Sequence, residues 1–216
     1  MTFEELQDAV LFNRFKESMR TPHVKRWLTS EYSYVWHAAD WQFKRVTAFE
    51  TGAELTVTAG DNTPTMPAAF AETISLLNHN GDPLLQLDPR VFEANYRNPS
   101  AGRGEPEAFT VVNRQVYLAP TPLTARTFYL AHRRLLCHKA DGSTVTSGKM
   151  NSNADTTMWG EDHDEVLVAG ARARGKKREQ DPTWQADEAE RDQLLTLMIG
   201  DLVAANVGSA YGRDTL

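Results

Sequence analysis

Cysteine is nearly absent from this chain of 216 residues, in which Cys137 is the only one. A single thiol excludes an intrachain disulfide framework and any zinc site that needs two or more thiolates. Uninterrupted apolar runs are also short, as in Leu135–Cys137, and fall far below the roughly 18–20 residues that cross a bilayer. The first residues, Met1–Glu5, lack the basic and apolar regions of a secretory signal. We therefore expect a protein with no membrane span that stays in the reducing cytoplasm.

An excess of basic residues is absent as well. The chain carries 23 lysines and arginines against 29 acidic residues, a formal net charge of −6, which disfavours nonspecific nucleic-acid binding through a basic surface. Seven acidic residues and one base, Arg191, lie between Glu179 and Asp201. A basic cluster directly precedes them and consists of Arg172, Arg174, Lys176, Lys177 and Arg178. Such polarity is found at assembly surfaces, although an ordinary solvated face is its commoner explanation.

Signatures of catalysis and of nucleotide binding are missing too. The stretch Gly142–Lys149 resembles a phosphate-binding loop, but five residues instead of four separate its glycines, and Met150 replaces the magnesium-binding hydroxyl. The nucleophile-elbow, zinc-protease and paired-carboxylate patterns do not occur. We expect no cofactor and no enzymatic activity.

Two groups of residues contain metal-ligand types without a convincing ligand set. His132, Cys137 and His138 lack a fourth partner at a suitable spacing, so structural histidines and a buried cysteine are the expected roles. The acidic run Glu161–Glu165 could hold a cation, but acids also gather at helix starts, where the helix dipole favours them. We therefore expect no metal site.

Apolar periodicity predicts two helices in the N-terminal part. Residues 2–19 repeat apolar side chains every two to four positions, and Thr2 with Glu5 forms a capping box at the start. A second helix is predicted over His23–Ala39 and ends in a group of aromatic residues. We expect these rings to lie in the buried core; the alternative function is stacking on nucleic-acid bases.

The helical pattern returns near the C-terminus. Asp162 and Glu165 are expected to cap a helix rich in small residues, which favours close helix contact. Asp181–Pro182 is expected to begin a further helix that Gly208 ends. Its apolar side chains are Ala186, Ala189, Leu194, Leu197, Met198, Leu202 and Ala205.

The middle of the chain has the features of β-structure. Alternation of apolar and polar residues begins near Val46. Ala71–Leu77 and Leu84–Leu87 flank a turn at Asn78–Asp82, which predicts a hairpin, and Asp88–Pro89 can begin a short helix.

Further strands are expected over Ala108–Val112, Gln115–Leu118 and Thr127–Leu136, with surface loops over Asn98–Glu105 and Lys139–Asn153. The expected class is α+β: a helical bundle from the N- and C-terminal segments with an inserted antiparallel β-rich domain. The corresponding parts are residues 1–44, 45–158 and 159–206, followed by a tail over 207–216.

The order of several short motifs is itself informative. Pro67–Phe70 reads P-x-x-F, and Gly104–Pro106 is followed by Val116–Pro122 and by Phe128–Leu130. Two helices ending in the aromatics of Tyr32–Trp41 precede these motifs, and an alanine-rich and an acidic helix follow them. This order resembles the head-to-tail adaptor, or connector, proteins of tailed bacteriophages over most of the chain, although the polar loop after Lys139 and the basic cluster depart from that pattern.

The resemblance implies a structural protein of the virion neck, made in the host cytoplasm. It implies a ring, typically twelve-fold, that sits below the portal protein, docks tail or neck proteins and lets double-stranded DNA pass through its lumen without sequence-specific binding. The alternative is a small-molecule or peptide-binding module that uses the β-rich insertion, and a hydrolase is a third.

Within the adaptor hypothesis, three sets of residues receive roles. The acids Asp187, Glu188, Glu190 and Asp192 would face the DNA channel and repel phosphates. The basic cluster would contact a neighbouring subunit or the portal. Tyr211, Arg213 and Leu216 of the tail would bind the portal, the alternative being a disordered end without function.

Overall fold

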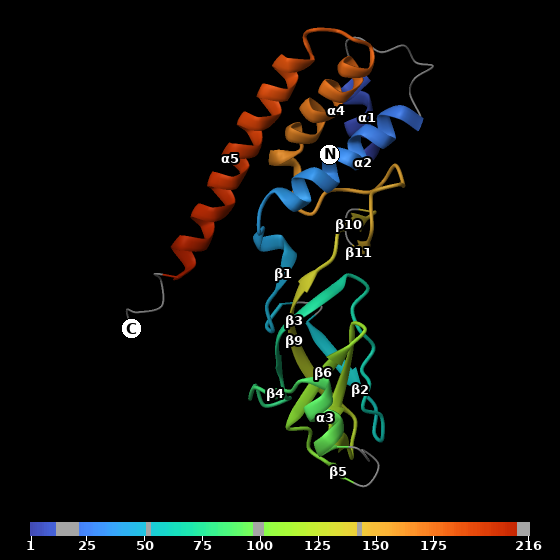
Figure 1. Ribbon diagram of the computed structural model, residues 1–216, viewed down its shortest axis with the longest axis vertical. Coiled ribbons are helices and arrows are strands. Elements are labelled where there is room, and N and C mark those ends of the chain that lie inside the picture. Colours follow the sequence, from blue (N-terminus) through green and yellow to red (C-terminus); the bar gives the residue numbers. More distant parts are fainter. Residues whose placement is uncertain (12–21, 51–52, 97–101, 142–143, 211–216) are drawn as a thin grey trace. The chain divides into compact units, whose positions relative to one another are not determined.

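Helices occupy both ends of the chain, and short strands fill its middle. The computed structural model describes residues 1–11, 22–50, 53–96, 102–141 and 144–210, with side chains as far as residue 202. The α-helices are α1 (Phe3–Leu11), α2 (Pro22–Ala38), α3 (Pro89–Asn95), α4 (Glu165–Arg178) and α5 (Trp184–Ala210), with short 3₁₀ helices η2 (Gln42–Lys44) and η3 (Glu161–His163). The strands are β1 (Arg45–Val46), β2 (Glu54–Val57), β3 (Phe70–Leu77), β4 (Leu85–Gln86), β5 (Arg103–Gly104), β6 (Ala108–Val112), β7 (Gln115–Ala119), β8 (Thr121–Pro122), β9 (Arg126–Arg134), β10 (Cys137–Ala140) and β11 (Thr144–Ser147). The predicted α+β class is confirmed (Figure 1).

The chain forms two compact units. We call residues 1–43 with 136–216 the helical unit, and residues 44–135 the β unit. The β-rich insertion expected from the sequence extends to residue 158, whereas in the structure the segment after residue 135 groups with the helices. Its backbone gives the reason, because the amide of Phe3, at the start of α1, donates to the carbonyl of Asp155 at 2.7 Å.

The surface loop expected over Lys139–Asn153 contains regular structure. β10 and β11 pair as an antiparallel hairpin, with Cys137 opposite Ser147. Cys137 is fully buried, as expected, and Tyr32 of α2 donates a hydrogen bond to its carbonyl. Strand β11 also lies within the stretch that resembles a phosphate-binding loop. The polar sequence concealed this strand because half-exposed threonines favour strands without showing apolar alternation.

Helix α4 is the most contacted element of the helical unit and packs against α1, α2 and α5. Nearly all of its residues from Val166 to Gly175 are buried. Its small side chains allow neighbouring helices to approach closely, as the sequence predicts. The closest approach is at Gly170, where an added Cβ would lie 2.5 Å from a carboxylate oxygen of Glu31 on α2.

The N-terminal helices begin where the sequence predicts. The amide of Thr2 donates to the Glu5 carboxylate at 2.7 Å, and the amide of Glu5 donates to the Thr2 hydroxyl at 3.3 Å. The capping box is therefore confirmed, and α2 agrees with its predicted range within a residue at each end. The predicted continuation of the first helix over 12–19 lies outside the described residues.

The starts and ends of the last two helices differ from the predictions. Asp162 lies within η3 and does not cap α4, whose first residue follows the buried Asp164. Helix α5 begins at Trp184, two residues after the predicted start. It also continues through Gly208, because one glycine costs a helix only about 1 kcal/mol and does not by itself end it. No helix in the described ranges is long and apolar enough to cross a membrane.

The aromatic residues of α2 and the turn after it form part of the core. Tyr32, Trp36 and Trp41 are buried. Tyr32 stacks on Trp159 with the ring centroids 4.9 Å apart. The core interpretation is confirmed for these rings, whereas Tyr34 is 42% exposed.

Strand β9 is central to the β unit. Its neighbours β1 and β2 pair with one edge, placing Val46 opposite His132 and Glu54 opposite Tyr129, and β3 pairs with the other edge. All three pairings are antiparallel. Strands β6 and β7 form an antiparallel hairpin, but β4 joins β6 in parallel and β5 pairs with β8 in parallel. The insertion is thus only partly antiparallel.

The hairpin predicted around Asn78–Asp82 is confirmed in its turn and in one antiparallel bridge, between Leu77 and Pro83, but its second arm does not continue along β3. The amide of Asn78 donates to the carbonyl of Asp82 at 2.8 Å, and Gly81 adopts a φ of 89° that favours glycine. After the turn the chain bonds back once, from Leu84 to Leu76, and then forms β4 beside β6. The turn signal is local, whereas the choice of strand partner is not.

The core of the β unit lies on one face of the β9 sheet. Alternate residues of the strands supply it, and β6 and β7 complete it with Phe109, Val116 and Leu118. The intervening residues, Glu54 of β2 and Tyr129 of β9, therefore project from the opposite face. The predicted strands over 108–112 and 115–118 are confirmed, as is the short helix after Asp88.

Substituting Gly170 tests the close packing of α4 on α2. Gly170→Ala should lower the free energy of unfolding of the helical unit by about 1–3 kcal/mol, because Glu31 is buried and cannot swing away from the added methyl. All five tryptophans of the chain belong to this unit, so their fluorescence during urea unfolding reports on it. Gly200→Ala is the control, because no atom lies within 4 Å of its added Cβ, and it should stabilise α5 by up to about 1 kcal/mol. Equal effects of the two substitutions would contradict the close packing.

The stability of the β unit should fall in mild acid because of His132. This side chain is 2% exposed, and burial lowers the pKa of its imidazole below the usual 6.5. Below about pH 6.5 the unfolded chain therefore binds a proton that the folded chain does not, and stability is lost as the pH falls toward the folded pKa. Hydrogen exchange of peptides from 44–135, corrected for its intrinsic pH dependence, measures this loss. His132→Gln should reduce it, and an unchanged pH dependence in the variant would refute the assignment.

Candidate functional site

The basic cluster of α4 and the acidic segment of α5 meet within the helical unit. The Lys176 ammonium lies 2.6 Å from the Asp187 carboxylate, and both side chains are largely buried. The Arg172 guanidinium lies 3.7 Å from the carboxylate of Glu190. Part of the charge polarity seen in the sequence is therefore neutralised between the two helices.

The remaining members of the basic cluster also have partners in this unit. The Lys177 ammonium lies 4.4 Å from the ring centre of Trp184, a cation–π distance. A guanidinium nitrogen of Arg178 lies 2.6 Å from Nδ1 of His23. These contacts are exposed, so each contributes little to stability and leaves its cation open to a partner protein.

Glu31 of α2 lies where α4 and α5 approach, and it is fully buried. Arg174 of α4 donates a hydrogen bond to one carboxylate oxygen, and Arg191 of α5 lies 3.9 Å from the other. Gly170 provides the space for this carboxylate. Removing one partner of a buried ion pair leaves an uncompensated charge and is strongly destabilising. We call Glu31, Gly170, Arg174 and Arg191 the Glu31 cluster.

Arg191 connects this cluster to the surface of α5. Its guanidinium lies 2.7 Å from the carboxylate of Asp192, 3.6 Å from that of Glu188 and 4.8 Å from the ring centre of Tyr34. Burial alone would lower the pKa of Arg191, but the hydrogen bond with Asp192 and the charge of Glu31 raise it above the ordinary value. The side chain therefore stays cationic beside the buried carboxylate.

The four acids assigned to the DNA channel do not share one surface. Asp187 is 7% exposed and turned toward Lys176. Glu188 and Asp192 lie four residues apart and share a helix face, whereas Glu190 lies on another face. Hydrophobic periodicity could not reveal this, because it assumes that charged residues point outward.

Helix α5 carries apolar side chains on more than one face. Leu195 and Met198 are buried, but Leu197 is 64% exposed. Leu197 borders a shallow hollow of about 520 Å³, whose other lining residues are Asp192, Gln193 and Thr196. The apolar side chains of α5 are therefore divided between the interior of the unit and its surface.

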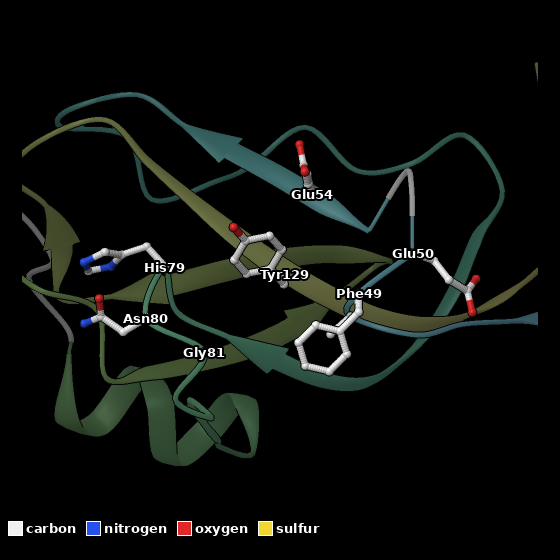
Figure 2. A pocket seen from close by; sticks show the side chains of 8 residues that line it. Phe49, Glu50, Glu54, His79, Asn80, Gly81 and Tyr129 are labelled. Carbon is white, nitrogen blue, oxygen red and sulfur yellow. The ribbon is translucent and has the colours of Figure 1, made fainter. Parts of the chain in front are cut away.

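A second hollow, of about 480 Å³, lies on the β unit, and we call it the β hollow. Three separate parts of the chain line it: the turn Ala48–Glu50, the strand residues Glu54 and Tyr129, and the turn His79–Gly81. Figure 2 shows the ring of Tyr129 between His79 on one side and Phe49 on the other. No motif marks this hollow in the sequence, because its parts lie far apart along the chain.

The lining of the β hollow is acidic and aromatic. Phe49 is 88% exposed, and Glu54 is exposed beside Tyr129 on the neighbouring strand. Glu50 accepts a hydrogen bond from the Thr47 hydroxyl at 3.0 Å. None of the described residues that line the hollow is a lysine or an arginine.

The other groups weighed from the sequence have structural partners. Asp164, in the acidic run, is buried, and it accepts hydrogen bonds from the Thr157 hydroxyl at 2.8 Å and the Met1 ammonium at 2.7 Å. Burial raises the pKa of this carboxyl. His138 is buried with its Nε2 3.3 Å from Asp155. Across the described ranges, no three potential metal ligands converge.

The tail residues assigned to portal binding follow the end of α5 in the sequence. Tyr211, Arg213 and Leu216 lie outside the described residues. Helix α5 extends to Ala210, so four residues of the expected tail are helical.

Comparison with known proteins identifies the family of this chain. The family model described as SU10 adaptor protein matches residues 1–215. No curated protein matches the chain. The family match includes both the helical unit and the β unit. This protein therefore belongs to the SU10 adaptor protein family, a family of phage adaptor proteins.

Proposed function

We propose that this protein is a head-to-tail adaptor subunit whose copies form a ring of about twelve below the portal protein. The ring joins the capsid to tail or neck proteins, and double-stranded DNA passes through its lumen. In this proposal the helices of the N- and C-terminal segments act as one bundle that carries the contacts between copies. Family membership supports the adaptor role.

The exposed Leu197 of α5 carries the assembly part of the proposal. It is 64% exposed beside a hollow, on a helix that packs on α4 through other side chains. An apolar side chain next to a hollow, with polar residues around it, is the composition of an interface core and rim. A ring of identical copies uses two different surfaces of each copy, so α5 can meet another part of its neighbour.

The charged residues receive narrower roles than the sequence suggested. Glu188 and Asp192 are exposed on one face of α5, and we assign them to the DNA channel, where negative charge repels phosphates. Glu190 lies on another face, beside Arg172, and is not part of this assignment. Asp187 instead stabilises the contact of α5 with α4. The exposed ends of the basic cluster are assigned to contacts with a neighbouring copy or the portal.

Charge placed at Leu197 should prevent assembly. Leu197→Glu should remain folded, because the side chain is exposed, but should not form a ring, since a carboxylate would be buried in the interface. Leu123→Glu is the matched control, because Leu123 is 60% exposed on the β unit. Mass photometry measures the size of each assembly, and electron microscopy with the portal shows which acids line the lumen. A ring of unchanged size from Leu197→Glu would contradict this interface, and a wild-type protein that stays monomeric with the portal would contradict the adaptor ring.

The tail should contribute to portal binding without being needed for the fold. Deletion of residues 211–216 leaves α5 complete and should weaken portal binding by about tenfold or more, because aromatic and arginine side chains dominate interface energies. The double variant Tyr211→Ala and Leu216→Ala should act similarly at full chain length. The control is Asp214→Ala with Thr215→Ala, and portal pull-down with quantification is the measurement. Undiminished binding after the deletion would assign the attachment to the helices.

A further inference from the structure

We propose that the β hollow binds an arginine side chain presented by an extended segment of a partner protein. This site is separate from the α5 surface and does not require the ring. It rests on the shape, charge and aromatic lining of one face of the β9 sheet.

The sheet supplies the floor of the site. Glu54 and Tyr129 are direct cross-strand partners on β2 and β9, and Leu77 of β3 is opposite Tyr129 on the other edge of β9. The side chains that alternate with them, such as Phe128, enter the core. The floor is therefore held by regular hydrogen-bonded strands, which fix the positions from which the Tyr129 and Glu54 side chains project.

The two turns supply the walls. Phe49 and Glu50 stand at one end of the hollow, and His79 and Asn80 stand at the other, as Figure 2 shows. Nδ1 of His79 lies 3.0 Å from the Glu105 carboxylate. The resulting volume of about 480 Å³ exceeds that of one side chain, so residues next to the bound arginine also have room.

The charge of the lining selects a cation. Glu54 places an exposed carboxylate beside Tyr129, and none of the described lining residues is a lysine or arginine. Glu50 also lines the hollow, but its side chain points away from Tyr129 in Figure 2. Within the described part of the chain, no hydrogen bond or ion pair engages the Glu54 carboxylate. An acidic or neutral ligand would leave this carboxylate unpaired, whereas a guanidinium can donate two parallel hydrogen bonds to it.

The aromatic side chains favour a guanidinium over a metal ion. Tyr129 is half-buried and Phe49 is 88% exposed, so an apolar surface is available on both sides of the space. A planar guanidinium stacks on such rings, while the methylene groups of arginine cover them. A hydrated divalent cation gains nothing from either ring, and no three potential metal ligands gather among the described residues.

The exposure of Phe49 points to a protein as the source of the arginine. A phenylalanine that is 88% exposed beside a hollow is the type of side chain that a partner covers. An arginine held by a peptide segment places backbone next to this ring, whereas free arginine leaves it in water. Recognition of one arginine is weak by itself, so the site adds to a larger contact between the two proteins.

Ligand-observed NMR with two peptides tests the proposal on the full chain. The probes are acetyl-Gly-Ser-Arg-Ser-Gly-amide and the same peptide with citrulline, which keeps the shape of arginine without its charge. Saturation transfer from the protein to the side-chain methylenes should be clear for the arginine peptide, with a Kd on the order of 1 mM, and at least about threefold weaker for citrulline. Glu54→Gln and Phe49→Ala should each reduce the arginine signal by about threefold or more. Both side chains are exposed, so neither substitution should disturb the fold.

Glu72→Gln is the matched control variant, because Glu72 is an exposed glutamate of the same sheet that lies outside the hollow and 3.8 Å from Arg133. It should bind the arginine peptide as the wild type does. Equal saturation transfer to the two peptides would overturn the proposal, because charge would then play no part. An arginine signal that persists in Glu54→Gln, or none with the wild type, would overturn it equally.

Discussion

The buried carboxylate of Glu31 is the constraint on which the helical unit depends. Its two arginine partners lie far along the chain, and Arg174 is 143 residues away. A carboxylate removed from water is costly unless both partners are present, so α2, α4 and α5 must be in place together. The pair thus favours one arrangement of helices over others that would bury similar apolar area. Glycine at position 170 is part of the same constraint, because any side chain there would occupy the space of the carboxylate.

The charges near Glu31 show why a run of like charges in a sequence overstates the charge that is exposed to a partner protein. The charges of Lys176 and Asp187 largely neutralise each other. Asp192 remains 58% exposed even though it contacts Arg191. The electrostatic surface of α5 is therefore set by which acids have a cation beside them and by the face on which each acid lies.

Features set by near neighbours could be predicted from the sequence, and those set by distant contacts could not. The capping box of Thr2 and Glu5 and the β6–β7 hairpin depend on residues a few positions apart, and both are found. The partner of β4 is chosen by tertiary packing, and the sequence pointed to the wrong strand.

The candidate sites follow the same division. The sequence shows Leu197 as one of the apolar side chains of α5, but it does not reveal that Leu197 is exposed while Asp187 and Arg191 are buried. The β hollow could not be predicted from the sequence. Its lining residues come from turns and strands between Ala48 and Tyr129, and the fold of the sheet brings them together. A pattern within one short stretch of sequence therefore cannot reveal such a site.

The pairing of β1 with β9 bears on how this protein could diversify. The first and last strands of the β unit lie side by side, with Arg45 opposite Arg133, so the chain enters and leaves the unit through adjacent hydrogen-bonded strands. The pairing of β1 with β9 keeps the two ends of the β unit close together, independently of the rest of the unit. A module whose ends are close tolerates exchange. Exchange of the β unit for another module with adjacent ends would therefore change the surface that this part of the chain presents and leave the residues of the Glu31 cluster in place.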